Sequence, residues 1–467
     1  MLPLREWQGA RPVLVNRIWV IALAATIITI CVAAYSGLLM FVSVTSLGLL
    51  LAFLFPMPAT VASVAWVLLV RPNTRLIQGT FAGFNVTEID ALVLLALIAC
   101  SRISRKQGIL QVHSRLSDWW PILAWPSWML ARSIMPSVGD VGFGSPLVDL
   151  RILSAFLLIV PLWTIASRRG GPALLGIICY SAYAACGIAI IAWALAQMHV
   201  VPRGSYPLAN LALGAAQDVR PGGEVLIPIL AVLLVFRQAP LLFNSRIASL
   251  GIVFGEILVS QTLSIAIASA VGICLALFTN WRQTSLASRM LICVILFGGG
   301  FMALSGTGTS TGADADISSR FNLAERIGQT SAQYRVTEAE TVARIYEDEP
   351  LVFMIGTGPG SLVTFNEGAL HEIKDLTHNV YNNVILKTGV LGLLMFAGGF
   401  LVLMSRLLRR SDALQRSLAG SLVAIAVLSL TVPFASTVSG LAGLLALATL
   451  AVWHLVGTST VKHRVNQ

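Results

Sequence analysis

The sequence turns from polar to apolar at Thr377-His378-Asn379-Val380-Tyr381-Asn382-Asn383-Val384-Ile385-Leu386-Lys387-Thr388-Gly389-Val390-Leu391-Gly392. The first half of this stretch carries an imidazole, a phenol and several amides. The apolar run that starts in its second half continues to about residue 405, which predicts a membrane helix over 384–405. The stretch therefore places a titratable side chain just outside a membrane helix.

The composition of the whole chain agrees with this local reading. Hydrophobic residues make up 56% of the 467 residues and charged residues 11%, and the mean hydropathy is +0.82. Soluble proteins carry about 25% charged residues. Only helices or closed barrels satisfy backbone hydrogen bonds in lipid. We therefore predict an all-α polytopic membrane protein with about 12–14 transmembrane helices, each of the usual spanning length, and one long extracytoplasmic loop containing short helices.

Apolar runs and their periodicity predict the individual helices. They are expected near residues 18–35, 38–55, 58–70, 88–101, 118–134, 148–166, 173–196, 223–236, 247–260, 262–279, 290–305, 384–405, 417–434 and 438–456. An even number of helices puts both termini on one side of the membrane.

The excess of basic residues follows these helices. The net charge is +10, and the Lys and Arg residues are scattered over short connecting loops rather than clustered. This is the positive-inside pattern of membrane proteins, so nucleic-acid binding is not expected. The basic loops fall on the same side as the termini, with Arg71 and Arg75 as two exceptions, which makes that side cytoplasmic.

The polar insertion falls on the opposite side. Segment 307–383 holds eleven of the 21 acidic residues of the chain and is too long to be a simple connector. We divide the chain into a multi-helix transmembrane region at 1–306, an extracytoplasmic loop at 307–383 that should carry the chemistry, and carboxyl-terminal transmembrane helices with a cytoplasmic tail at 384–467.

Neither the cysteines nor the acids predict a metal centre. All six cysteines fall inside apolar runs, where they read as small packing residues. Asp314-Ala315-Asp316 matches the bare Asp-x-Asp motif with which nucleotide-sugar transferases hold a divalent metal. It lies, however, on the side of the membrane where nucleotide sugars are absent. We therefore expect no metal and no other cofactor.

A short charged helix is predicted within the loop, over residues 332–347. Its apolar positions group on one face, and Pro350 should end it. Arg335 and Arg344 are nine residues apart, which places them on nearly opposite sides of the helix. Each could be a solvated charge paired with a neighbouring acid, or a ligand for an anionic group.

Two further motifs follow. The turn Gly356-Thr357-Gly358-Pro359-Gly360 could present N–H groups to an anion, those of Gly358 and Gly360 among them, or could be purely structural. His378 is the best candidate base, because an unperturbed imidazole pKa of about 6.5 lets it accept a proton near neutrality. His371 is its competitor.

Polar residues also gather at the outer ends of other predicted helices. Arg220 precedes one helix, and Arg151, which follows Asp149, begins another. Gln261 lies at the same level. Glu256 is near that end, and we expect it to face a cavity because a carboxylate facing lipid would be costly.

An arginine at the start of a charged helix, a glycine-rich turn, and His-Asn leading into a helix follow one another in this order. The order resembles the carboxyl-terminal signature of the O-antigen ligase and O-antigen polymerase superfamily, specifically over about 335–392 and architecturally elsewhere. The resemblance implies a glycosyltransferase of the bacterial inner membrane, with several membrane passes and an active site that faces outward. Its donor would be a glycan linked to undecaprenyl pyrophosphate.

The resemblance also implies residue roles. His378 would take the proton from the acceptor hydroxyl, and Arg335 and Arg220 would stabilise the departing phosphate. Asn379 and Asn383 would orient the acceptor or the imidazole.

One position departs from the family pattern. Gln261 stands where the family often carries an arginine; its amide donates a hydrogen bond but has no charge.

Two questions stay open at this stage. The acceptor is another lipid-linked repeat unit in a polymerase, and lipid A-core or another terminal glycan or lipid acceptor in a ligase. A flippase and chain-length proteins are the partners that either system implies, besides membrane lipids. The alternative class is a lipid-linked oligosaccharide flippase or other polytopic transporter. Transporters bury charges near the bilayer midplane and often have two related halves, whereas polar residues here gather at outer helix ends and no repeat is visible.

Overall fold

The architecture comes from a computed structural model. It describes residues 48–69, 78–81, 84–107, 116–135, 142–143, 146–197, 223–260, 263–280, 330–348, 350–367, 370–374, 379–410, 412–430, 432 and 438–465. The expected helices at 18–35 and 290–305, and most of that at 38–55, lie outside these residues.

The described elements are mainly helices. Before the polar insertion they are α3 (Pro56–Leu69), β1 (Gln78–Phe81), β2 (Phe84–Thr87), α4 (Glu88–Gln107), α5 (Leu116–Ile134), β3 (Gly142–Phe143), α6 (Pro146–Arg151), η2 (Ile152–Leu158), α7 (Ile159–Arg169), α8 (Gly171–Gln197), α10 (Leu226–Val235), η3 (Leu242–Asn244), α11 (Arg246–Ser260) and α12 (Leu263–Asn280). From the insertion onward they are α16 (Thr330–Asp348), α17 (Pro350–Ile355), β4 (Ser361–Glu367), β5 (Leu370–Lys374), α18 (Val380–Leu408), α19 (Ala413–Leu428) and α20 (Val438–Val465).

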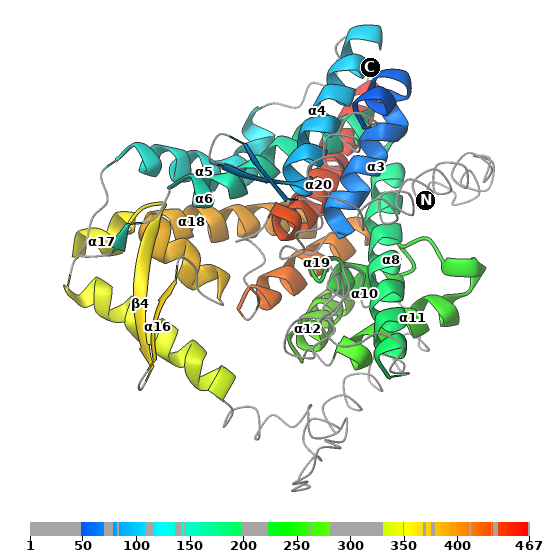
Figure 1. Cartoon of the computed structure of the whole chain (residues 1–467). Helices are drawn as coiled ribbons and strands as arrows, with labels where there is room; N and C mark the ends of the chain where they lie inside the picture. Colours follow the sequence, from blue (N-terminus) through cyan, green and yellow to red (C-terminus); the bar gives the residue numbers. More distant parts are fainter. Residues whose placement is uncertain are drawn as a thin grey trace, which may run out of the picture.

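The predicted helical membrane class is confirmed. Within the described residues, three helices are long and apolar enough to cross a membrane: Asp149–Arg169, Gly171–Ile191 and Val380–Leu408. Figure 1 shows α5 and α18 side by side, extending from a bundle that includes α3, α4, α8 and α20. The elements α16, α17 and β4 lie at the far end of that extension.

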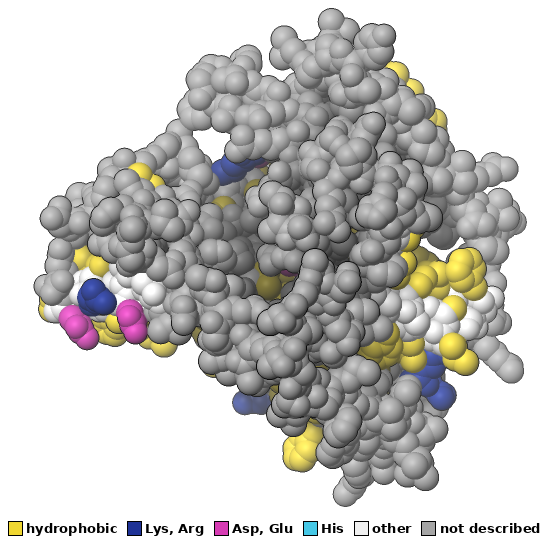
Figure 2. Space-filling model, turned by 60° about the horizontal axis from the view of Figure 1, so that its bottom comes forward, with side chains coloured by type: hydrophobic (Ala, Val, Ile, Leu, Met, Phe, Trp, Pro, Cys, Tyr) yellow, Lys and Arg dark blue, Asp and Glu magenta, His cyan; other side chains and the backbone are white. Residues whose placement is uncertain are grey.

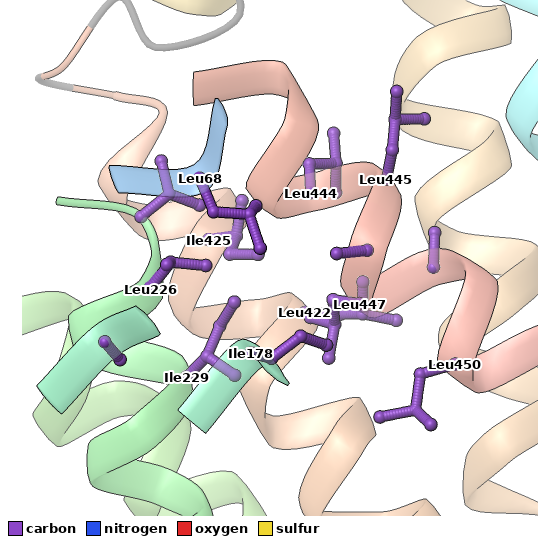
Figure 3. Packing of buried hydrophobic residues seen from close by; sticks show 14 of the residues in the cluster. Leu68, Ile178, Leu226, Ile229, Leu422, Ile425, Leu444, Leu445, Leu447 and Leu450 are labelled. Carbon is purple, nitrogen blue, oxygen red and sulfur yellow. The ribbon is translucent and has the colours of Figure 1, made fainter. Parts of the chain in front are cut away.

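The bundle has an apolar core. All ten residues of α10 are buried, and leucine and isoleucine side chains of α3, α8, α10, α19 and α20 point toward one another in Figure 3. Small residues let helices approach closely, because a Cβ at Gly272 of α12 would press against the Gly420 carbonyl of α19. Without water to drive association inside lipid, such close packing holds the helices together.

The described side chains at the surface are largely apolar. Among the described side chains on the face in Figure 2, hydrophobic ones predominate, and large hydrophobic residues such as Leu94, Ile191 and Leu401 are exposed. A surface of this kind suits contact with lipid chains.

The polar insertion contains strands that the sequence reading did not predict. Strands β3, β4 and β5 form one antiparallel sheet in that order. Gly142 and Phe143 of β3 pair with Leu362 and Ser361, so the insertion is tied to the region before it rather than standing apart. Pro350 ends α16 as expected, but it also begins α17, as a proline at the first helical position can.

The main irregularity is a break in α18. Gly389 has φ 69° and ψ −175°, which no helical residue adopts. In an unbroken helix, the carbonyl groups of the three preceding residues would accept hydrogen bonds across this point. Here they accept from other segments: Leu386 O from Thr357 N at 2.8 Å, Lys387 O from Gly358 N at 3.1 Å, and Thr388 O from Trp128 Nε1 at 2.8 Å.

Gly389→Ala should unfold this junction. Its φ is in the left-handed region, and a Cβ would overlap the Met354 carbonyl. Strain and overlap together predict a loss of more than about 2 kcal/mol in the free energy of unfolding. Gly398→Ala on the same helix is the control, because a Cβ there meets nothing within 4 Å. Thermal unfolding of the purified variants should show a lower midpoint for Gly389→Ala alone; equal midpoints would contradict the assignment of Gly389 to a strained contact.

Candidate active site

The glycine-rich turn docks on the break in α18. Gly356, Gly358 and Gly360 all have positive φ, at 77°, 102° and 85°. A Cβ at Gly356 would overlap the backbone of Thr388 and Gly389. The turn therefore needs glycine both for its conformation and for its approach to the helix backbone.

The N–H groups of this turn are used within the protein. Gly358 N donates to Lys387 O, and Gly360 N donates to the Asp149 Oδ2 atom at 2.6 Å. The sequence left open whether the turn presents N–H groups to an anion or is purely structural; in the structure, Gly360 N donates to an internal carboxylate. The expectation that Gly358 and Gly360 offer these N–H groups to a substrate phosphate is therefore not carried forward.

A buried ion pair joins the turn to the two helices. Lys387 Nζ lies 2.9 Å from Asp149 Oδ2 and donates to Ser361 O at 2.6 Å. The side chains of Lys387 and Asp149 are 3% and 9% exposed. A buried pair holds its geometry because separating either charge from its partner in a low-dielectric setting is costly. Three distant segments, at α6, β4 and α18, thus meet at one point.

Arg132 closes the other side of the turn. It is fully buried at the end of α5, and its guanidinium donates to Ile355 O and Gly356 O, each at 3.0 Å. These carbonyl groups stand at the end of α17, where helix geometry leaves them without intrahelical donors. The Arg132 guanidinium donates the hydrogen bonds that these carbonyl groups lack, and α17 is thereby fixed against α5.

A small pocket opens beside the ion pair. Its internal space is about 10 Å³, roughly enough for one water molecule, and it is lined by Trp125, Met129, Asp149, Ile152, Val380, Asn383, Val384 and Lys387. The lining comes from α5, the helix that begins with α6, and the first two turns of α18. Polar groups in an otherwise apolar pocket are typical of ligand sites.

The residues predicted at the start of α18 lie around this pocket. Asn383 lines it. Asn379 is the N-cap of α18, and its Oδ1 atom accepts from Tyr381 N at 2.8 Å and from Asn382 N at 3.3 Å. The side-chain oxygen of Asn379 thus fixes where the helix begins. His378 immediately precedes this cap in the chain but lies outside the described residues.

Helix α16 packs against the first segment of α18. Val342 and Leu386 are buried together, with Ile345 and Tyr346 packed around them. The Tyr346 ring lies edge-on to Phe353 at 5.6 Å between centroids, and burial raises the pKa of the Tyr346 phenol. This apolar contact fixes α16 to the segment of α18 just before the break at Gly389, to which the glycine turn also binds.

Of the two arginines of α16, Arg344 is the one whose side chain lies in the described part of the chain. Arg344 is 75% exposed on the outer face and lies 4.0 Å from Glu340, so the solvated-charge interpretation holds for it. Figure 2 shows basic and acidic side chains together on this side of the molecule. In the backbone of α16, position 335 lies about two turns before Val342 and about one turn before the buried Glu338. The three positions therefore lie on one side of the helix. The side chain of Arg335 lies outside the described part of the chain, so its role stays a prediction.

Other predicted residues are placed less directly. Arg220, Gln261 and His378 lie outside the described residues, so their roles stay predictions. Glu256 is fully buried, as expected for a carboxylate that avoids lipid. Arg151 pairs with Asp90 of α4, and both are partly exposed.

Metal binding stays untested at the one motif that suggested it, because Asp314 and Asp316 lie outside the described residues. Within the described ranges, no group of three or more His, Cys, Asp or Glu residues could hold a metal ion.

Comparison with known families adds an independent finding. Residues 247–397 match the family described as O-antigen ligase. This part of the chain is similar to the O-antigen ligase family, which supports the resemblance that the sequence motifs indicated. The matched range contains the glycine turn, the break in α18 and the part of the pocket that α18 contributes. No curated protein matches the sequence.

Asp149 and Arg132 lie before the range that matches the O-antigen ligase family, and the sequence reading missed both, together with Lys387, as site residues. One signal was available: charged residues inside apolar helices are costly unless paired or functional. Lys387 stands in such a run, and Asp149 stands at the edge of another. Their pairing across 238 residues was not visible in the sequence.

The ion pair should show strong coupling in stability. Lys387→Met leaves Asp149 buried without its cation, and Asp149→Asn leaves Lys387 without its anion, so each should cost about 3–5 kcal/mol of unfolding free energy. The double variant has no uncompensated charge and should be more stable than either single variant. Thermal unfolding measures this cycle. Arg344→Ala is the control and should change stability by less than about 1 kcal/mol, because its pair is exposed. Strictly additive losses would show that the pair makes no buried contact.

Proposed function

We propose that this protein is a glycosyltransferase that moves a glycan from undecaprenyl pyrophosphate to an acceptor hydroxyl. The observation that carries the proposal is the pocket at the start of α18. It brings Asp149, Asn383 and Lys387 together within a membrane protein, and His378 stands directly before the cap of the helix that forms it. The O-antigen ligase match over 247–397 supports the same chemistry.

The proposed reaction is a single displacement. His378 accepts the proton of the acceptor hydroxyl, the hydroxyl oxygen bonds to the anomeric carbon, and the bond from that carbon to the pyrophosphate oxygen breaks. The lipid pyrophosphate leaves with the bonding electron pair. Arg335 of α16 and Arg220 stabilise the negative charge on the departing phosphate. Asn379 and Asn383 orient the acceptor or the imidazole.

We place this chemistry on the outer face of the bacterial inner membrane. Helix α18 begins beside the pocket and ends at Arg406, Arg409 and Arg410, a basic cluster that favours the cytoplasmic side. The pocket end then faces outward, with segment 307–383 as the catalytic loop between transmembrane regions at 1–306 and 384–467. The acceptor is a second lipid-linked glycan in a polymerase or a terminal acceptor in a ligase.

The base is tested by two histidine variants. A positioned general base contributes about 10²–10⁴-fold to turnover, so His378→Ala should slow conversion of lipid-linked glycan by that factor. His371→Ala is the control, because position 371 lies in β5, where it pairs with Asn366 of β4. Purified variants are compared by the rate at which the lipid-linked glycan is consumed. Near-normal turnover by His378→Ala would remove the base from this reaction, and an inactive His371→Ala would move the role to that residue.

The two arginines of α16 provide a matched pair. Arg335→Ala should lower kcat strongly, by about 10²-fold or more, because it removes a charge from the leaving phosphate. Arg335→Lys should recover only part of the activity, since lysine lacks the bidentate guanidinium fork. Arg344→Ala changes the same residue type on the exposed side of the same helix and should leave kcat unchanged. Equal effects at the two positions would contradict an inward role for Arg335.

A further inference from the structure

The connection between α10 and α11 carries two arginines and no acid. Between Glu224 and Glu256, the only charged residues in the sequence are Arg237 and Arg246. Helices α8, α12 and α19, which pack against α10 or α11, contain no Asp or Glu either. Glu256 itself is about 15 Å further along α11 than Arg246. The helices that surround this connection therefore supply no anion to balance its positive charge.

The two arginines lie close together at the end of α10. Arg246 Nη2 donates to Val235 O, the last carbonyl of α10, at 2.8 Å, and Arg237 follows Val235 by two residues. Burial, and then the charge of Arg237, lower the pKa of the Arg246 guanidinium. Arg237 is exposed, and neither arginine pairs with a carboxylate in the described part of the chain. Two like charges held this close repel each other, and an anion bound between them removes that repulsion.

Large apolar side chains project beside these charges. Phe243 and Ile247 are each 85% exposed, and Leu241 is 38% exposed. The backbone here is unusual, because Arg237, Phe243 and Asn244 have φ of 59°, 51° and 55°. Among the described residues, every other positive φ belongs to a glycine. Such conformations are costly for residues with side chains, and they persist where the surrounding structure fixes them, as at ligand sites.

Hydrogen bonds hold the connection in this shape. Tyr183 of α8 donates from its hydroxyl to Pro240 O at 3.0 Å, and Leu242 N donates to Ser249 Oγ at 2.8 Å. Ser249 Oγ in turn donates to Ser245 O at 2.8 Å. A fixed backbone therefore presents the charged and the apolar side chains together.

This combination selects an anion that also has an apolar part. Arginine binds phosphate groups through its planar set of N–H donors. Exposed phenylalanine and isoleucine side chains gain free energy when acyl chains replace the water around them. The connection joins two helices that the sequence predicts to lie in the membrane, so it falls where headgroups meet hydrocarbon. A free phosphate would satisfy the arginines but would leave Phe243 and Ile247 in water.

We propose that the connection between α10 and α11 is a binding site for an anionic phospholipid. The lipid phosphate lies at Arg237 and Arg246, and the acyl chains lie against Phe243 and Ile247. The positive-inside pattern accounts for the arginines alone, whereas this site also accounts for the exposed apolar side chains beside them. The site goes beyond the proposed glycosyl transfer and does not depend on it.

Native mass spectrometry of the full-length protein in detergent tests the site by counting the phospholipids that each protein molecule retains. Phosphatidylglycerol should be retained in preference to phosphatidylcholine with the same acyl chains, and glycerol phosphate should not displace it. Arg237→Gln removes one cation and should weaken the tightest phosphatidylglycerol binding about fivefold. Phe243→Ser should weaken it by a similar factor, because the ring loses its contact with acyl chains. Both side chains are exposed, so neither variant should unfold the protein.

The matched control is Arg409→Gln, which removes an exposed arginine at the end of α18 and should leave this binding unchanged. Arg237→Lys should retain most of the binding, because the charge remains. Equal retention of the two phospholipids would overturn the site, as would unchanged binding in both Arg237→Gln and Phe243→Ser. An equal loss in Arg409→Gln would show a general effect of charge instead of a site. Displacement by glycerol phosphate would show a site for free phosphate instead of lipid.

Discussion

The break in α18 at Gly389 is the constraint on which the candidate site depends. Inside a membrane protein, freed backbone carbonyl groups cannot be left to lipid, so the break exists only because other segments supply donors. The glycine turn and Trp128 supply them. The turn can come close enough because Gly356 and Gly389 lack side chains where their backbones meet. Two glycine motifs that stand apart in the sequence are therefore two halves of one contact.

This contact determines where the charged residues lie. Once the turn is docked, Gly360 N reaches Asp149, Lys387 meets the same carboxylate, and Arg132 binds the end of α17 from the other side. The first segment of α18 is thus fixed to α5 and α6. This is the end of the helix that His378 directly precedes in the sequence. A reaction that displaces a lipid pyrophosphate needs its groups held in place, because misplacement of about 1 Å can cost about 10²-fold in rate.

The sequence predicted the membrane class and most helices, because apolar run length responds directly to bilayer thickness. It also allowed a solvated charge at Arg344, which the exposed pair with Glu340 confirms. It did not predict the β3–β4–β5 sheet, because β3 is two residues long and pairs with a strand more than 200 positions later. Nor did it show that the glycine turn binds an internal carboxylate, since Asp149 lies 211 residues from Gly360. Local signals were readable, and the long-range pairings that build the pocket were not.

The central claim is that glycan transfer takes place at the start of α18, where His378 precedes the helix. A lipid-pyrophosphate-linked glycan with a photoreactive group on its first sugar tests this most directly. After irradiation with the full-length protein in nanodiscs, mass spectrometry identifies the attached peptides. The account predicts adducts within residues 379–387 and around Trp125 and Asp149, removed by excess unlabelled lipid-linked glycan. Competable adducts confined to the opposite end of α18, around Arg406 to Arg410, would contradict it.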